Sequence, residues 1–280
     1  MSEVRRVKLG KILFGDPYGF VLIAGPCVIE SESSVLRHAE KISKIISKFK
    51  IPYVFKSSYD KANRSSLKSL RGPGLKKGLA ILAKVKKQFG FPVLSDVHCK
   101  EEIKPAAEVL DILQIPAFLC RQTDLLTAAG KTKRIVNVKK GQFLSPWEIK
   151  NVIQKVEATG NRNILITERG ASFGYQNLVN DFRAIPIIRG FGYPLVFDAT
   201  HSVQLPGGEG SHTGGRPEFI PMLARCAVAA GADALFMEIR EEPHKALSDG
   251  TNMLSLNQLA PLLEVLENIR RVAPMTKDAA

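Results

Sequence analysis

The feature that most constrains the fold is a regular alternation of short apolar runs with segments of helical spacing. The apolar runs cover residues 20–24, 53–55, 92–94, 112–115, 135–138, 164–166, 194–197 and 234–237. Between them apolar residues recur three or four positions apart, as Val35, Ala39 and Ile42 do, which is typical of amphipathic helices. Eight β-then-α units without a linker-like break predict a TIM (β/α)8 barrel, an α/β fold of about 250 residues.

The predicted domain organisation is a single catalytic barrel at 20–280, preceded by an extension at 1–19. We expect Gly15-Asp16 to turn a small hairpin in this extension that caps the barrel bottom. A doubly wound open sheet is the alternative fold. The first run is followed by Gly25-Pro26-Cys27 rather than by GxGxxG, which weakens a dinucleotide-binding interpretation.

The formal net charge of +13 raises nucleic acid or an acidic membrane surface as partners. The basic residues are spread along the chain without an aromatic-interleaved strip or a known nucleic-acid-binding motif, so we expect neither partner. An enzyme with two phosphorylated substrates would be equally basic. The sequence has no apolar run of about 18 residues and no secretory signal, and its four cysteines lack paired spacing. These features predict a soluble cytoplasmic protein.

Polar side chains follow every candidate strand, where barrel enzymes carry their catalytic groups. A single polar loop residue has an ordinary structural explanation, but the coincidence over all eight positions indicates an active site. We expect Lys140, next to Lys139, to be a surface charge. The residues at the strand ends are Cys27, Lys56, Lys61, Asp96, His98, Gln114, Lys139, Glu168, Arg169, Asp198, His201 and Glu238.

Four of these strand-end residues are cations, namely Lys56, Lys61, Lys139 and Arg169. Lysine offers a mobile point charge and arginine a planar fork of donors, so together they suit a ligand with phosphate and carboxylate groups. The glycine-rich segment 205–215 can present backbone N–H groups to phosphate or act as a lid, and a flexible surface loop is the alternative.

A second set, Cys27, His201, Glu238 and Asp249, can form a metal site. Thiolate, imidazole and carboxylate together suit zinc, iron(II), manganese or cobalt better than calcium. The residues are far apart in sequence, but closure of a barrel places the first strand beside the eighth. Taken alone, Cys27 is equally a small buried hydrophobe and His201 a hydrogen-bonded loop residue.

Nine segments together resemble the 3-deoxy-D-manno-octulosonate 8-phosphate synthase family, and the resemblance covers nearly everything from 20 to 266. They are IAGPCVIES (23–31), FKSSYDKANRSS (55–66), RGPGL (71–75), SDVH (95–98), QIPAFLCRQTDLL (114–126), NVKKGQF (137–143), TERGASFGY (167–175), FDATHSVQLPGG (197–208) and ALSDGTNML (246–254). The resemblance implies a TIM barrel, usually a homotetramer. It also implies condensation of phosphoenolpyruvate with D-arabinose 5-phosphate on the path to lipopolysaccharide.

The resemblance also implies roles for individual residues. Phosphoenolpyruvate would be held by Lys56, Lys61, Gln114, Ala117, Lys139, Arg169 and His201, and arabinose 5-phosphate by Asn63, Arg64, Ser65 and Asp96. The catalytic set would be His201, Asp249, Lys56 and Lys61. Cys27 and Ser248-Asp249-Gly250 are similar to the metal-requiring branch, whose ion could be Zn, Fe(II), Mn, Co or Cd; the metal-free branch has asparagine in place of the cysteine. The metal could polarise the aldehyde or activate water, and Asp249, Glu238, His201 or phosphate could be the general base.

Three alternatives stay open. The related synthase that uses erythrose 4-phosphate typically has KPRTSP where this chain has KSSYDKANRSS, which favours the five-carbon sugar. Sialic-acid-type synthases are more distant. A non-catalytic nucleic-acid or anion-binding protein on a barrel scaffold would explain the charge, but it has no reason to retain Cys27, His201, Glu238 and Asp249 together.

Overall fold

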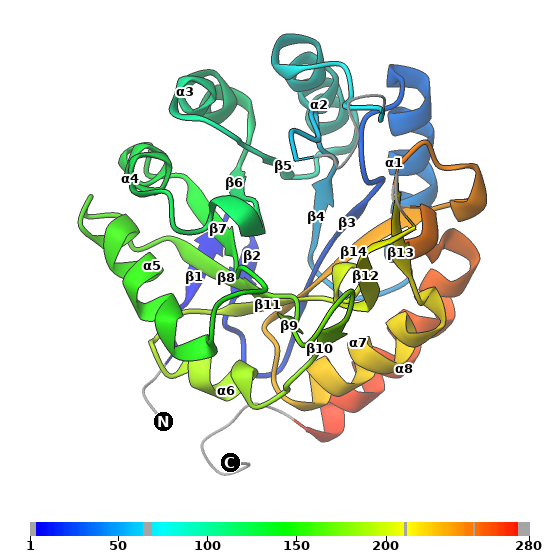
Figure 1. The fold of residues 1–280 in the computed structure, drawn as a ribbon. Coiled ribbons are helices and arrows are strands. Elements are labelled where there is room, and N and C mark those ends of the chain that lie inside the picture. The colour runs from blue at the N-terminus through cyan, green and yellow to red at the C-terminus, as the bar shows by residue number, and fades with distance from the viewer. Residues whose placement is uncertain (1–3, 64–68, 210–211, 249, 274–280) are drawn as a thin grey trace.

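The computed structural model describes residues 4–63, 69–209, 212–248 and 250–273, and these form a closed barrel of parallel strands surrounded by helices (Figure 1). Within the described residues the eight barrel strands are β3 (Val21–Gly25), β4 (Tyr53–Lys56), β5 (Val93–Asp96), β6 (Ile112–Ile115), β7 (Ile135–Lys139), β8 (Ile164–Glu168), β11 (Leu195–Asp198) and β14 (Ala234–Arg240). Each pairs in parallel with the next, and β14 pairs with both β11 and β3. The predicted TIM barrel is confirmed.

The helices form the outer layer. They are α1 (Glu32–Ile46), α2 (Leu75–Phe89), α3 (Lys100–Val109), α4 (Thr123–Lys131), α5 (Ile149–Glu157), α6 (Ala184–Arg189), α7 (Ile220–Ala229) and α8 (Leu256–Val272). Short 3-10 helices are η1 (Ala117–Leu119), η2 (Pro146–Glu148), η3 (His201–Val203), η4 (Pro217–Phe219), η5 (Pro243–Lys245) and η6 (Gly250–Asn252). Ser145 and Glu148 form a capping box at the start of η2. None of the helices in the described part of the chain is long and apolar enough to cross a bilayer.

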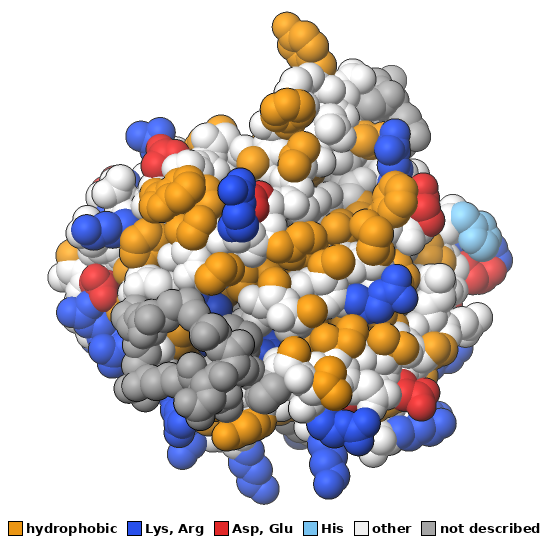
Figure 2. Space-filling view, turned by 90° about the horizontal axis from the view of Figure 1, so that it is seen from below, with side chains coloured by type: hydrophobic (Ala, Val, Ile, Leu, Met, Phe, Trp, Pro, Cys, Tyr) orange, Lys and Arg blue, Asp and Glu red, His pale blue; other side chains and the backbone are white. Residues whose placement is uncertain are grey.

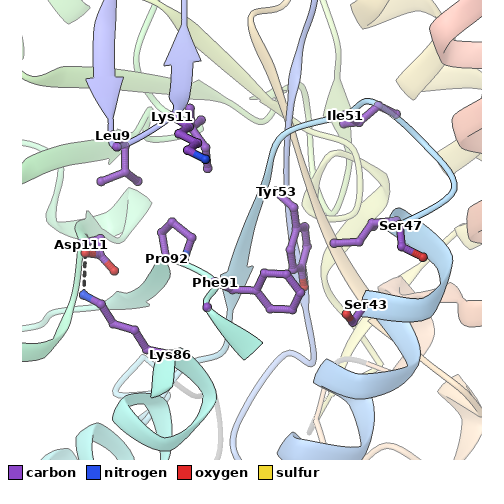
Figure 3. A pocket seen from close by; sticks show the side chains of 14 residues that line it. Leu9, Lys11, Ser43, Ser47, Ile51, Tyr53, Lys86, Phe91, Pro92 and Asp111 are labelled. Carbon is purple, nitrogen blue, oxygen red and sulfur yellow. Dashed lines mark hydrogen bonds and ion pairs between the residues drawn. The ribbon is translucent and has the colours of Figure 1, made fainter. Parts of the chain in front are cut away.

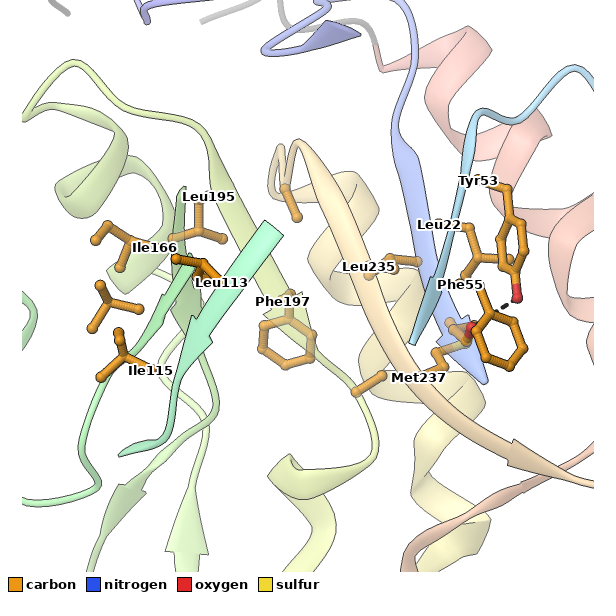
Figure 4. Close-up of a cluster of buried hydrophobic side chains, with 14 of the residues drawn as sticks. Leu22, Tyr53, Phe55, Leu113, Ile115, Ile166, Leu195, Phe197, Leu235 and Met237 are labelled. Carbon is orange, nitrogen blue, oxygen red and sulfur yellow. Dashed lines mark hydrogen bonds between the residues drawn. The ribbon is translucent and has the colours of Figure 1, made fainter. Parts of the chain in front are cut away.

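Successive residues of each barrel strand face two different cores, because side chains alternate across a strand. Leu22 and Ala24 belong to the core between strands and helices, whereas Val21 and Ile23 belong to the core inside the barrel. With both faces buried, the strands are apolar almost throughout, as parallel strands commonly are. Figure 4 shows part of the outer core, including Leu22, Phe55, Leu113, Ile115, Ile166, Leu195, Phe197 and Leu235.

The N-terminal extension folds as an antiparallel hairpin of β1 (Val7–Leu9) and β2 (Ile12–Phe14). Its turn lies at Gly10-Lys11, where Gly10 has a φ of 56°, so the prediction of a turn at Gly15-Asp16 was wrong. Val7, Ile12 and Phe14 join the core inside the barrel. The hairpin therefore covers the amino-terminal end of the barrel and leaves the carboxyl end as the mouth.

Additional short strands lie around the mouth of the barrel. β9 (Ala171–Ser172) pairs with β10 (Leu178–Val179), β12 (Gln204–Glu209) pairs with β13 (His212–Gly215), and β15 (Leu254–Ser255) pairs in parallel with the end of β14. The β12–β13 hairpin is the glycine-rich segment of the sequence. The Gln176 amide donates to the Gly207 carbonyl over 3.1 Å, which links the two hairpins over the barrel end (Figure 1).

Candidate active site

A cavity of about 330 Å³ opens at the carboxyl ends of the barrel strands. It brings together seven of the predicted site residues: Lys61, Asn63, Asp96, Ala117, Lys139, Arg169 and His201. His98, Pro116, Phe118, Gln142, Gln204, Pro206 and Gly207 complete the lining. The cavity therefore lies where active sites lie in barrels of this type, and cations occupy much of its wall.

A larger pocket of about 590 Å³ lies at the opposite end, between the N-terminal hairpin and helices α1 and α2 (Figure 3). Leu9, Tyr53 and Phe91 line it, and Lys86 forms an ion pair of 2.7 Å with Asp111 at its edge. This pocket lacks the converging cations of the mouth, so its size does not make it the better candidate for an anionic substrate.

A buried cluster of two lysines and a glutamate adjoins the mouth cavity, and Lys61 is the member that lines it. The register of β3 and β14 sets Gly25 beside Glu238. Lys56 Nζ lies 2.5 Å from Glu238 Oε1 and donates to the Cys27 carbonyl over 2.9 Å, and Lys61 Nζ lies 3.3 Å from the same Glu238 oxygen. Burial would raise the pKa of Glu238, but the charges of Lys56 and Lys61 hold this pKa well below its usual range. The cluster therefore contains an ionised carboxylate between two ammonium groups.

Lys139 occupies a second buried ion pair. Its Nζ donates to Asp198 Oδ2 over 2.7 Å and lies 3.9 Å from the centre of the Phe236 ring. Lys56 Nζ lies 5.3 Å from the centre of the same ring, so the Phe236 ring is a neighbour of both cations. Burial lowers the pKa of Lys139, and the charge of Asp198 opposes that shift.

Asp198 also orients His201. Its Oδ1 accepts the backbone N–H groups of Thr200 and His201 over 3.2 and 2.8 Å, and its Oδ2 lies 2.8 Å from His201 Nδ1. Burial lowers the pKa of His201 despite the nearby Asp198 charge, so the neutral imidazole is favoured. Nε2 then lies 3.7 Å from Glu238 Oε2. A carboxylate behind a histidine that faces a second ligand is a common metal-site arrangement.

The residues at this point fit a divalent ion. Glu238 Oε2 is buried without a hydrogen-bond partner among the described residues, and His201 Nε2 faces it. Metal–ligand bonds of about 2.0–2.2 Å place neighbouring nitrogen and oxygen ligands about 3 to 4 Å apart, as these two atoms are. Cys27 Sγ lies 3.2 Å from Ser248 Oγ. Asp249 lies outside the described residues, within which no group of three or more potential ligands converges.

Asp96 ends a chain of hydrogen bonds that crosses several barrel strands. Gln114 donates to Asp96 over 2.6 Å, Asn137 donates to Gln114 over 2.9 Å, and Thr167 donates to Asn137 over 2.7 Å. Ser58 donates to the other oxygen of Asp96 over 2.5 Å. Burial would raise the pKa of Asp96, but the neighbouring lysines keep it well below its usual range. A fixed anionic acceptor therefore faces the cavity.

Arg169 lies at the cavity wall. Its guanidinium donates to the His201 carbonyl over 3.1 Å and to the Gln204 side chain. Glu168 accepts the backbone N–H groups of Arg169 and Gly170 over 2.9 and 2.6 Å, which fixes the turn that carries the guanidinium.

The remaining predicted site residues fall into two groups, those buried beside the cavity and those outside the described residues. Cys27, Lys56, Gln114 and Glu238 are buried, at most 1% exposed, and none of them lines the cavity. Arg64 and Ser65 lie outside the described residues. The prediction that Lys140 is a surface charge was wrong: the residue is 1% exposed, and its ammonium group donates to backbone carbonyls and lies 3.5 Å from Glu168 Oε1. Sequence reasoning missed Ser58, Asn137, Thr167 and Phe236; the two-residue spacing of Asn137 and Lys139 on one strand face was the available signal.

Comparisons with known proteins agree with this geometry. A family model described as "DAHP synthetase I family" matches residues 3–273. Three curated relatives carry the name 2-dehydro-3-deoxyphosphooctonate aldolase. The protein of Geobacter metallireducens is 59% identical over 265 residues, 95% of this chain and 97% of the relative. The proteins of Trichlorobacter lovleyi and Pelobacter propionicus are each 58% identical over 268 residues, 96% of this chain and 98% of theirs. The chain therefore belongs to the DAHP synthetase I family.

Proposed function

We propose that this chain condenses phosphoenolpyruvate with D-arabinose 5-phosphate and water, giving 3-deoxy-D-manno-octulosonate 8-phosphate and phosphate for lipopolysaccharide precursor synthesis. The observation that carries the proposal is the convergence of Lys61, Lys139 and Arg169 on one cavity whose lining also includes Asn63 and Asp96. The cations suit an anionic substrate and the amide and carboxylate suit a polyhydroxylated one. The octonate in the relatives' names supports an eight-carbon product and weighs against the erythrose 4-phosphate alternative.

The geometry supports two kinds of role, substrate contact for residues that line the cavity and positioning for residues buried next to it. Lys61, Lys139 and Arg169 would balance the carboxylate and phosphate of phosphoenolpyruvate, and Ala117 would contact it from the wall. Lys56 and Gln114 act indirectly. They donate hydrogen bonds to Glu238 and Asp96 and so hold these carboxylates in place. C3 of the enol attacks the aldehyde carbon while water adds at C2. The resulting hemiketal phosphate then loses phosphate by C–O cleavage.

We further propose that His201 and Glu238 hold a divalent ion with Cys27 and Asp249. The ion, which could be zinc, iron(II), manganese, cobalt or cadmium, would supply Lewis acidity toward the aldehyde oxygen or the attacking water. Burial favours the neutral imidazole of His201, and Asp198, whose Oδ2 lies 2.8 Å from Nδ1, orients the ring so that Nε2 faces Glu238. The unpartnered Glu238 oxygen supports this proposal, because a buried carboxylate oxygen without a donor favours a cation.

A homotetramer located in the cytoplasm is the proposed state of the enzyme. Figure 2 shows apolar side chains spread over the side of the barrel around α6. Elsewhere along the described chain, Phe143, Trp147, Phe219 and Met222 are large hydrophobic residues that are at least 39% exposed. Exposed apolar surface of this kind is typical of subunit interfaces. Light scattering coupled to size exclusion tests the proposal, and a monomeric mass would contradict it.

The decisive experiment incubates the purified protein with phosphoenolpyruvate and either arabinose 5-phosphate or erythrose 4-phosphate, with and without a chelator. We expect phosphate release and an eight-carbon product with the five-carbon sugar. Preference for erythrose 4-phosphate, or no turnover of either sugar, would overturn the proposed reaction. Full activity after chelation would refute only the metal. Cys27→Ala should lose bound metal by elemental analysis, and Cys27→Asn tests whether metal-free turnover survives.

A further inference from the structure

One wall of the mouth cavity is formed by Gln142, which has no role in the reaction as described above. Its side chain lines the cavity, and the residue is only 8% exposed. Its amide oxygen is buried and has no hydrogen-bond donor among the described residues. Buried polar atoms are nearly always hydrogen-bonded, so a ligand that enters the cavity with a donor group would satisfy this oxygen.

The loop that carries Gln142 is held from behind by Lys140. The Lys140 ammonium donates to the carbonyls of Gly141, Leu144 and Gly170 over 3.3, 3.0 and 3.4 Å. These contacts join the loop after β7 to the loop after β8. In addition, the Ser172 N–H donates to the Gln142 carbonyl over 2.9 Å. The backbone on both sides of Gln142 is therefore held in place at the cavity that Gln142 lines.

The space behind this loop is fully used. A Cβ atom at Gly141 would lie 2.7 Å from the Phe143 ring and 3.2 Å from the Ala117 carbonyl. The loop thus packs against the segment that also lines the cavity at Ala117. This close packing at Gly141 restrains the backbone that carries Gln142, and a restrained acceptor loses less entropy when a ligand binds.

The chemistry of an acceptor distinguishes the two proposed substrates. Lys61, Lys139 and Arg169 offer only donors, which suit phosphate and carboxylate. An amide oxygen needs a donor, and hydroxyl groups are present on the sugar phosphate but absent from phosphoenolpyruvate. Resting on the function proposed above, we propose that Gln142 binds a hydroxyl group of the sugar phosphate and that Lys140 is the positioning residue that holds it there.

The test uses steady-state kinetics with a shape-matched variant, Gln142→Met, which keeps the side-chain length and removes the amide. We expect the KM for arabinose 5-phosphate to rise about three- to tenfold, the value of one hydrogen bond, with the KM for phosphoenolpyruvate within about twofold of wild type. Equal rises in both constants, or no rise in either, would overturn the proposal.

Deoxy analogues of the sugar phosphate identify the contact. With the analogue that lacks the bound hydroxyl, wild type and Gln142→Met should have the same KM, whereas other deoxy analogues should keep the difference. A difference that persists for every analogue would also overturn the proposal. Absence of arabinose 5-phosphate turnover by the wild type would instead refute the proposed function, so the two failures are distinguishable.

Lys140→Met tests the positioning role. If this variant folds, its KM for the sugar phosphate should rise selectively. With the deoxy analogue that lacks the bound hydroxyl, its KM should equal that of the wild type. In the double variant with Gln142→Met, the KM for the sugar phosphate should then differ little from that of Lys140→Met alone. An unchanged KM in Lys140→Met, or fully additive effects in the double variant, would remove Lys140 from the proposal. If Lys140→Met does not fold, the Gln142 variants still decide the contact itself.

Discussion

The chain of hydrogen bonds behind Asp96 gives a prediction that can be worked out in detail. An ionised carboxylate can only accept, so Gln114 must turn its NH₂ group toward Asp96 and its oxygen toward Asn137. Asn137 must then turn its own oxygen toward Thr167, whose hydroxyl must donate. All four residues are at most 7% exposed. Thr167→Val keeps the shape of the side chain and removes the last donor.

The expected cost follows from burial. Thr167→Val leaves the Asn137 oxygen buried without a donor, which costs about 1 to 3 kcal/mol of the free energy of unfolding. Urea denaturation followed by circular dichroism, at one fixed protein concentration, measures this loss as a lower midpoint with an unchanged slope. In an Asn137→Leu background the acceptor is already gone, so Thr167→Val should cost almost nothing there.

This double-mutant comparison can refute the reasoning. Equal costs of Thr167→Val in the two backgrounds would mean that the hydroxyl and the amide do not interact. A cost near zero in the wild-type background would mean that the chain can reverse its direction. Reversal would require Asp96 to be protonated, contrary to the depressed pKa that the neighbouring lysines cause.

Three further predictions concern the mouth of the barrel. Lys139→Ala should raise the KM for phosphoenolpyruvate about tenfold or more, because a charge at the cavity wall is lost, and unchanged steady-state kinetics would remove the residue from the site. Gly25→Ala would place a Cβ atom 2.0 Å from the Lys56 carbonyl oxygen. Such overpacking should cost about 1 to 3 kcal/mol, and a thermal melt like that of the wild type would contradict the close approach. Burial lowers the pKa of His98, but the hydrogen bond to Glu102 and nearby carboxylates outweigh it and the pKa is raised. His98 should therefore stabilise the fold fully below about pH 6.5, and this contribution should disappear as the pH rises through the raised pKa. Urea midpoints between about pH 5.5 and 8.5 test this, since His98→Gln should flatten that part of the profile.

The barrel and the position of its mouth could be predicted from the sequence, because both depend on periodicity. Apolar runs and helical spacing fix the order of elements, and closure then follows from the number of units. The pairing of Gly25 with Glu238 across the closing strands is a direct result. Residues more than two hundred positions apart thus became predictable neighbours, although nothing in their local sequence links them.

The turn of the N-terminal hairpin could not be predicted in the same way. Gly10 and Gly15 both have positive φ angles, 56° and 88°, so both are locally suited to a turn. The choice between them depends on which apolar residues reach the barrel interior. Val7 and Phe14 pair across the hairpin and are both buried there, a contact that only the assembled barrel provides.

The buried environment of Lys140 could not be predicted from the sequence either. Lys139 and Lys140 are adjacent, and strand alternation predicts that they point to opposite sides. Strand alternation does not show whether the side to which Lys140 points faces solvent or is covered by two loops. The hydrogen-bond partners of the Lys140 ammonium are backbone carbonyls, which every residue has and no sequence signal marks, and its carboxylate neighbour Glu168, 3.5 Å away, comes from a different strand.

The pairing of charges explains why the mouth can be both buried and cationic. Isolated buried lysines would lose their protons, because desolvation lowers their pKa. Here Glu238 lies beside Lys56 and Lys61, and Asp198 lies beside Lys139. These carboxylates hold the lysine side chains in position before any substrate enters, which is the pre-organisation that transition-state stabilisation requires. An ammonium group has three donors, so a lysine that holds a carboxylate can still bind an entering phosphate. The carboxylates are therefore as necessary to anion binding as the cations they accompany.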